Sequence, residues 1–124
     1  MSALVQVIAA LIATCLVVVG LLEIFAYRNP RLYPIFVIEP DDQDAVRMWA
    51  ICVGFYNLVF AAGIFLGLAL LHWGDPAAGR ALVLFLTGAH VLLGIVLVAV
   101  QPRLWRSAIG EALPPAVLLG LTFA

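Results

Sequence analysis

The sequence predicts an all-α integral membrane protein, a bundle of four transmembrane helices. Hydrophobic residues make up 66% of the 124 residues, and charged residues only 10%. A water-soluble domain of this size needs roughly 25% charged residues to cover its surface, so much of this surface must face lipid. The apolar residues also fall into four runs, each near the roughly 20 residues that a helix needs to cross a bilayer. We therefore expect one transmembrane domain over residues 1–124.

The four expected spans end at proline, glycine or charged residues, which are ordinary helix stops. They cover about residues 3–27, 46–71, 81–100 and 105–123. No basic segment precedes the first run, which is also longer than the apolar core of a signal peptide. We therefore expect it to be retained as a span.

The arginines predict how the chain is oriented. The sequence has no lysine, and five of its six arginines lie in or beside the first and third connections between spans: Arg28, Arg31, Arg47, Arg103 and Arg106. Positive charge collects on the cytoplasmic side of a membrane. We therefore expect these two connections inside the cell, both termini outside, and a multi-pass location in the cell membrane.

The first connection, residues 28–45, is the only long one. The apolar stretch Ile35–Ile38 lies between prolines and an acidic run. We expect it to lie on the membrane surface or to fold over the bundle as a lid. Asp41 and Asp42 are candidates to cap the second span, because carboxylates suit a helix N-terminus.

Three ionisable residues lie inside the expected spans, where charge is costly and usually functional. They are Glu23 in the first span, His90 in the third and Glu111 in the fourth; Tyr56 and Asn57 lie near the middle of the second. With a rise of about 1.5 Å per residue, all five fall in the cytoplasmic half of the bundle or near its middle. We predict a shared cavity there.

This arrangement predicts a site for acid/base chemistry. Glu23, Glu111 and His90 are its candidate catalytic residues, because neighbouring carboxyls do not both ionise easily, and together they supply an acid and a base. The candidate substrate-binding residues are Asn57, Tyr56, Thr87 and Gln101. No His or Glu spacing typical of a metal site occurs, so we expect neither a metal nor a cofactor.

Each residue also has a purely structural interpretation. Glu23 could pair with Arg28 or Arg103. Glu111 could pair likewise with Arg106 or Arg47. His90 could donate to a nearby carbonyl, and Asn57 could join two helices.

Several short motifs resemble a family of small four-span bacterial membrane proteins catalogued only as a domain of unknown function. They are Leu22-Glu23-Ile24-Phe25, Gly54-Phe55-Tyr56-Asn57, Ala61-Ala62-Gly63 with Gly67, and Gly110-Glu111 with Pro114-Pro115-Ala116. The resemblance covers nearly the whole chain. It implies four membrane helices and carries over Glu23, Tyr56 and Asn57, but it supplies no reaction.

The chain departs from this family pattern at a few positions. Leu16 stands where the family usually has His, Cys52-Val53 where it has Asn-Gln, and Glu111 where it has Gln. Glu111 and His90 therefore look particular to this protein. The gain of a second carboxyl suggests a specialised site.

Three functions fit these features. The first is a cofactor-independent enzyme that isomerises, cyclises or opens the ring of a lipid-soluble small molecule. The second is a non-catalytic membrane subunit or lipid-binding partner, and the third is a proton-coupled carrier that uses Glu23. We expect lipid and a lipid-soluble molecule as partners and no nucleic acid. Any homodimer or larger complex is expected to form through the close-approach pair Gly63 and Gly67.

Overall fold

The computed structural model describes all 124 residues, and it contains helices and no strand. Four helices are long: α1 (Ala3–Phe25), α3 (Arg47–Trp73), α4 (Pro76–Val100) and α5 (Trp105–Phe123). Four short helical elements lie in the connections: η1 (Pro30–Leu32), α2 (Tyr33–Phe36), η2 (Pro40–Asp42) and η3 (Pro102–Leu104). The all-helical prediction is confirmed.

Local sequence explains where two of the long helices begin. The Ser2 hydroxyl accepts from the Val5 N–H, and the Asp75 carboxylate accepts from the Ala77 N–H, so each caps its helix. Proline suits the first turn that follows such a cap, and α4 therefore begins at Pro76 rather than near residue 81.

The predicted cap of the second span is wrong. Asp41 and Asp42 form part of η2, and Val46 precedes α3 without a side-chain cap. The backbone carbonyl of Asp42 accepts from the Val46 N–H instead, at 3.0 Å.

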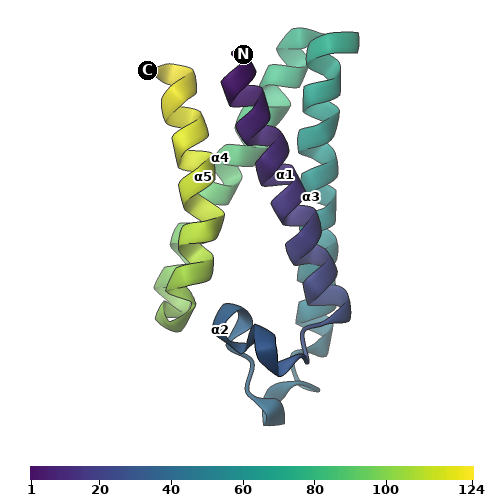
Figure 1. Cartoon of the computed structure of the whole chain (residues 1–124), viewed down its shortest axis with the longest axis vertical. Helices are drawn as coiled ribbons and strands as arrows, with labels where there is room; N and C mark the ends of the chain where they lie inside the picture. Colours follow the sequence, from purple (N-terminus) through teal and green to yellow (C-terminus); the bar gives the residue numbers. More distant parts are fainter.

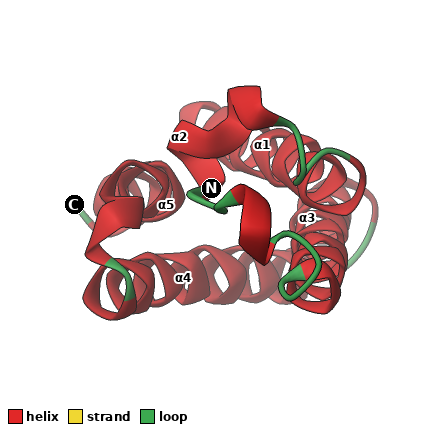
Figure 2. Ribbon diagram, turned by 90° about the horizontal axis from the view of Figure 1, so that it is seen from below, coloured by secondary structure: helices red, strands yellow, loops and turns green.

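The long helices pack in chain order: α1 on α3, α3 on α4, and α4 on α5, with less contact between α1 and α5. Both termini lie at one end of the molecule, and α2 lies at the other (Figure 1). Toward that second end, the pair α1/α3 separates from the pair α4/α5, and the first connection lies beneath them (Figures 1 and 2).

Glycines set how closely neighbouring helices approach. A Cβ atom on Gly20 of α1 would lie 2.7 Å from the carbonyl oxygen of Gly54 of α3, and the reverse distance is the same. Likewise, a Cβ on Gly79 of α4 would lie 2.6 Å from the Gly67 carbonyl of α3. These helices touch through their backbones because neither glycine of a pair has a side chain.

The pair Gly63 and Gly67 packs within the chain. A Cβ on Gly63 would meet Leu86 of α4, and one on Gly67 would meet Val83. A second copy that bound through these two residues would have to displace α4.

The surface of the molecule is apolar. Only 20 of the 124 residues are buried, whereas large side chains such as Leu11, Val59 and Phe85 are at least 60% exposed. Helices α1, α3 and α4 are long and apolar enough to cross a membrane. Helix α5 is less apolar, because it carries Arg106, Glu111 and two prolines.

Candidate functional site

Each long helix turns one stripe of residues toward its neighbours, and the predicted polar residues continue these stripes. On α1 the buried residues Leu16 and Gly20 are followed, three residues on, by half-buried Glu23. On α5 the buried Ala108 is followed at the same spacing by half-buried Glu111. A spacing of three or four residues keeps side chains on one face of a helix. Both carboxyls therefore face helices rather than lipid.

Glu23 and Asn57 join α1 to α3. The Asn57 amide donates to Oε1 of Glu23 at 3.0 Å. Gly20 and Gly54 lie three residues earlier on the same two helices, so their backbone contact brings the carboxyl and the amide within reach. The second carboxyl oxygen, Oε2 of Glu23, is buried and has no partner.

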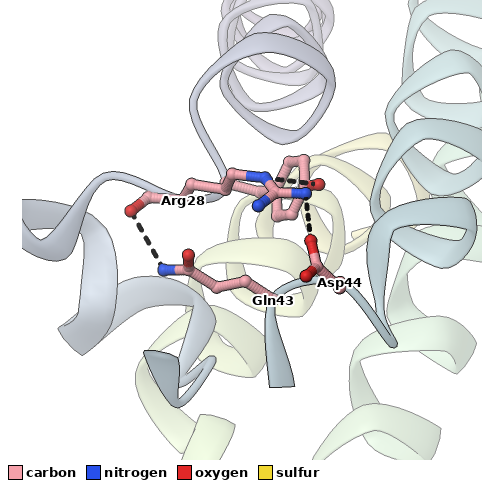
Figure 3. A network of polar contacts seen from close by, with 4 residues as sticks. Arg28, Gln43 and Asp44 are labelled. Atoms are coloured by element: carbon pink, nitrogen blue, oxygen red, sulfur yellow. Dashed lines mark hydrogen bonds and ion pairs between the residues drawn. The ribbon is translucent and has the colours of Figure 1, made fainter. Parts of the chain in front are cut away.

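The arginines of the first and third connections bind elsewhere. Arg28 pairs with Asp44 at 2.6 Å (Figure 3), and Arg103 pairs with Glu39 at 3.4 Å. These are the two ion pairs of the chain, so the expected alternative in which arginines neutralise Glu23 is wrong.

Glu111 has no arginine partner either. It makes neither a hydrogen bond nor an ion pair. Two carboxyls from different helices thus share the end of the bundle near the first connection, without a cation to lock them.

His90 lies in the core, with 1% of its surface exposed. Its Nδ1 is 2.9 Å from the backbone carbonyl oxygen of Leu86, which confirms the expected contact with a carbonyl. The His90 and Phe60 rings make an edge-to-face contact, with 4.9 Å between their centroids. The other nitrogen, Nε2, is buried and has no partner.

The structure places the remaining predicted residues apart from Glu23. The buried Thr87 hydroxyl donates to the Val83 carbonyl of its own helix at 2.8 Å, so its hydrogen bond is satisfied. Tyr56 is 60% exposed on the outer face of α3, and Gln101 is exposed at the C-terminal end of α4. Of the predicted set, Glu23 and Asn57 bond to each other, His90 is buried in the core, and Glu111 is half-buried.

Sequence reasoning missed two contributors to the site. Phe60 contacts His90, and Gly20 allows the close approach of α1. Phe60 lies three residues after Asn57, so helical spacing could have placed both residues on one face of α3. Gly20 has no sequence signal of its own, because its partner Gly54 is on another helix.

The first connection is fixed to the start of α5. The Ser107 hydroxyl donates to the Ile35 carbonyl at 2.6 Å, and the Arg103 guanidinium donates to the Tyr33 hydroxyl at 2.7 Å. The Tyr33 hydroxyl in turn donates to Glu39 at 2.6 Å. The stretch Ile35–Ile38 is therefore held against the start of α5, which agrees with the alternative that it folds over the bundle. Its contact with the membrane surface stays a prediction.

This connection contains a hollow of about 230 Å³. Tyr27, one turn beyond Glu23 on the stripe of α1, is one of its lining residues. The others are Asn29, Pro30, Leu32, Tyr33, Phe36, Ile38, Pro40 and Gln43. This hollow thus lies next to the C-terminal end of α1. The shared cavity predicted around Glu23 and Glu111 stays a prediction.

Acid is expected to loosen this connection. The hydrogen bond from Tyr33 lowers the pKa of Glu39. Because the pKa in the docked state lies below that of a free glutamate, the bond stabilises docking above the free value of about 4.3. That contribution is lost as the pH falls through the lowered pKa. A spin label at position 41 should therefore gain mobility below pH 4.

The matched control for this experiment is Glu39→Gln. Its amide does not titrate, so the label should show the same mobility from pH 7 to pH 3. A transition of equal size in this variant would contradict the role given to Glu39.

Fold and composition together define an all-helical protein with the long apolar helices of an integral membrane protein. The chain belongs to the family described as protein of unknown function (DUF1304), whose model matches residues 3–123. This confirms the family resemblance inferred from the motifs around Glu23 and Asn57. The searches of curated proteins and of solved structures gave no match.

Proposed function

We propose that this protein is an integral membrane enzyme that performs acid/base chemistry on a lipid-soluble small molecule. One observation carries the proposal: Glu23 is oriented by Asn57 through one oxygen, while its other oxygen is buried without a partner. A second half-buried carboxyl, Glu111, lies at the same end of the bundle. The large majority of buried polar side-chain atoms in proteins have a hydrogen-bond partner, so an unpartnered oxygen indicates more than a structural role.

The chemistry follows from the two carboxyls. One donates a proton to an epoxide, alkene or carbonyl, and the other removes a proton from a neighbouring carbon. The protons balance in such an isomerisation, so no other reactant is needed. Asn57 acts as a positioning residue, because its bond fixes the oxygen that faces away from the substrate.

The apolar outer surface supports a substrate that arrives through lipid. Long apolar helices flank Glu23, which lies on α1 and bonds to Asn57 of α3. A lipid-soluble molecule can enter between helices without crossing water.

We further propose that α5 is a fourth span and that the arginine-rich end of the bundle lies on the cytoplasmic side of the cell membrane. A single cysteine at position 2, with Cys15 and Cys52 replaced by alanine, should react with an impermeant maleimide added outside intact cells. A cysteine at position 41 should react only after the cells are opened. The opposite pattern would reverse the orientation.

The enzyme proposal is tested without knowledge of the substrate. Purified protein in nanodiscs is incubated in D₂O with a total lipid extract of its own cells, and the extract is compared by mass spectrometry before and after. An acid/base isomerase should convert at least one compound and leave deuterium in the product, because the proton that it adds comes from a group that exchanges with solvent. No converted compound would count against an enzyme.

A carrier gives a different result. Protein in liposomes would then couple the uptake of a compound from the same extract to proton flux, and that compound would keep its mass and its protium. Proton-coupled uptake without conversion would replace the enzyme proposal.

A further inference from the structure

Two buried side-chain atoms lack a hydrogen-bond partner, and both belong to residues that contact the same part of α3, at Asn57 and Phe60. They are Oε2 of Glu23 and Nε2 of His90. Buried polar groups without partners are rare in proteins, and an unmade bond in the interior is destabilising. Two such atoms against neighbouring turns of α3 indicate a place for a polar molecule.

The residues that carry these two atoms contact positions of α3 that are about one helical turn apart. Glu23 contacts Asn57, and His90 contacts Phe60. Asn57 and Phe60 are three residues apart on α3, which corresponds to a rise of about 4.5 Å. One small molecule is long enough to reach both levels.

The bond made by Nδ1 decides what Nε2 can bind. A backbone carbonyl only accepts, so the Nδ1 that contacts the Leu86 oxygen must carry the proton. In a neutral imidazole, Nε2 then has a lone pair and no hydrogen. The site therefore requires a hydrogen-bond donor.

The surroundings of His90 are apolar, since its ring meets the edge of Phe60 and the neighbouring residues of the α4 stripe include Val83 and Leu86. Thr87 does not supply the donor, because its hydroxyl already donates to carbonyls of α4. The donor has to come from outside the chain, on a molecule that tolerates an apolar environment.

We propose that the substrate is an apolar alcohol. Its hydroxyl donates to Nε2 of His90, while Glu23 acts on a carbon a few bonds away, at the level of Asn57. This inference rests on the proposed function and adds the substrate class and the residue that recognises it. His90 is then a binding residue that fixes the position of the reacting carbon.

The test uses two probes that differ in one donor: 1-dodecanol and dodecyl methyl ether. Protein in phosphatidylcholine nanodiscs is labelled with ¹⁵N-histidine, and the chain has only two histidines, so His90→Phe assigns the signals. The alcohol should shift the Nε2 signal of His90 and bind about tenfold more tightly than the ether, the factor for one neutral hydrogen bond. The affinity for each probe is measured from the increase in the unfolding temperature of the protein as the probe concentration rises.

The variants separate this inference from the enzyme proposal. His90→Phe keeps an aromatic ring but lacks the acceptor, so it should bind alcohol and ether equally. Glu23→Gln should keep the preference for alcohol while it loses turnover. His72→Phe, at the other end of the bundle, should behave as the natural chain.

Three results would overturn the inference. Alcohol and ether could bind equally to the natural chain. The His90 signal could already be that of a hydrogen-bonded nitrogen before any probe is added and stay unchanged, which means that a resident water is the donor. Third, turnover of a compound without a hydroxyl would contradict the proposal that the substrate is an alcohol, while the proposal of an enzyme would stand. A preference for alcohol without any turnover would support the binding site at His90 and contradict the proposal that the protein is an enzyme.

Discussion

Replacing Glu23 by glutamine should lower the rate of the converted reaction by about 10²–10⁴-fold, the usual contribution of a general acid or base. The amide neither gives nor takes a proton. Its oxygen can still accept from Asn57 at the position of Oε1, so the contact between α1 and α3 is kept. The measurement is deuterium incorporation into the product by the purified variant, with unfolding in sodium dodecyl sulfate as the check on the fold.

The matched control is Glu39→Gln, which makes the same change on the exposed first connection. This variant should keep full activity. The Glu39 side chain is exposed on the first connection and bonds only to Tyr33 and Arg103. Glu111→Gln should show a loss comparable to that of Glu23→Gln. If both Glu23→Gln and Glu111→Gln fold and work normally, the acid/base site does not exist, and a structural subunit becomes the better description.

The Asn57 contact gives a graded version of the same test. Asn57→Leu removes the donor and leaves the carboxyl in place. Because Asn57 only positions Glu23, the rate should fall less than in Glu23→Gln. An equal or larger fall in a folded variant would mean that Asn57 takes part in the chemistry.

Adding one methyl group at Gly54 should destabilise the protein by about 1–3 kcal/mol, the range for overpacking a well-filled contact. The new Cβ in Gly54→Ala would lie 2.7 Å from the Gly20 carbonyl oxygen and 2.6 Å from Ile24. A backbone oxygen cannot move aside as the tip of a side chain can, so α1 and α3 must separate. Equilibrium unfolding in mixed micelles measures the loss.

Gly88→Ala is the control for this change, because a Cβ at Gly88 of α4 meets nothing within 4 Å. Alanine forms helix more readily than glycine by about 0.8–1.0 kcal/mol, so this variant should be as stable as the natural chain or more stable. Equal stability of Gly54→Ala and Gly88→Ala would contradict the backbone contact. Gly54→Ala should also slow the reaction, since separating α1 from α3 weakens the bond between Glu23 and Asn57.

Much of the fold was predictable because membrane helices are governed by local properties. Helix length follows from the thickness of the bilayer, and helix ends follow from residues such as Pro30 and Gln101-Pro102 that stop an apolar run. The start of α4 was missed, because the window of apolar residues begins after Arg80, whereas the backbone already becomes helical at the Asp75 cap. The capping role given to Asp41 and Asp42 failed for a related reason, since both lie in η2 and residues 43–46 form a turn between η2 and α3.

Part of the candidate site was also predictable. Glu23, Asn57, His90 and Glu111 stood out because polar groups in an apolar span are costly. Tyr56 stood out equally, yet it lies on the outer face of α3. Hydropathy reports that a residue is in a span, and only the packing of the helices decides which side of the helix meets protein.

The sequence alone determined the helical class, the long apolar runs, the family and the residues that are expensive to place in lipid, because each depends on composition or spacing along one chain. Tertiary structure decided which groups meet. The close approach of Gly20 to Gly54 brings Glu23 within hydrogen-bond distance of Asn57. Arg28 forms its ion pair with Asp44, and Arg103 with Glu39. Nε2 of His90 has no donor. The physical reason is the short range of hydrogen bonds and backbone contacts: a few ångströms of helix approach make or remove a partner, and no pattern within a single helix records that distance.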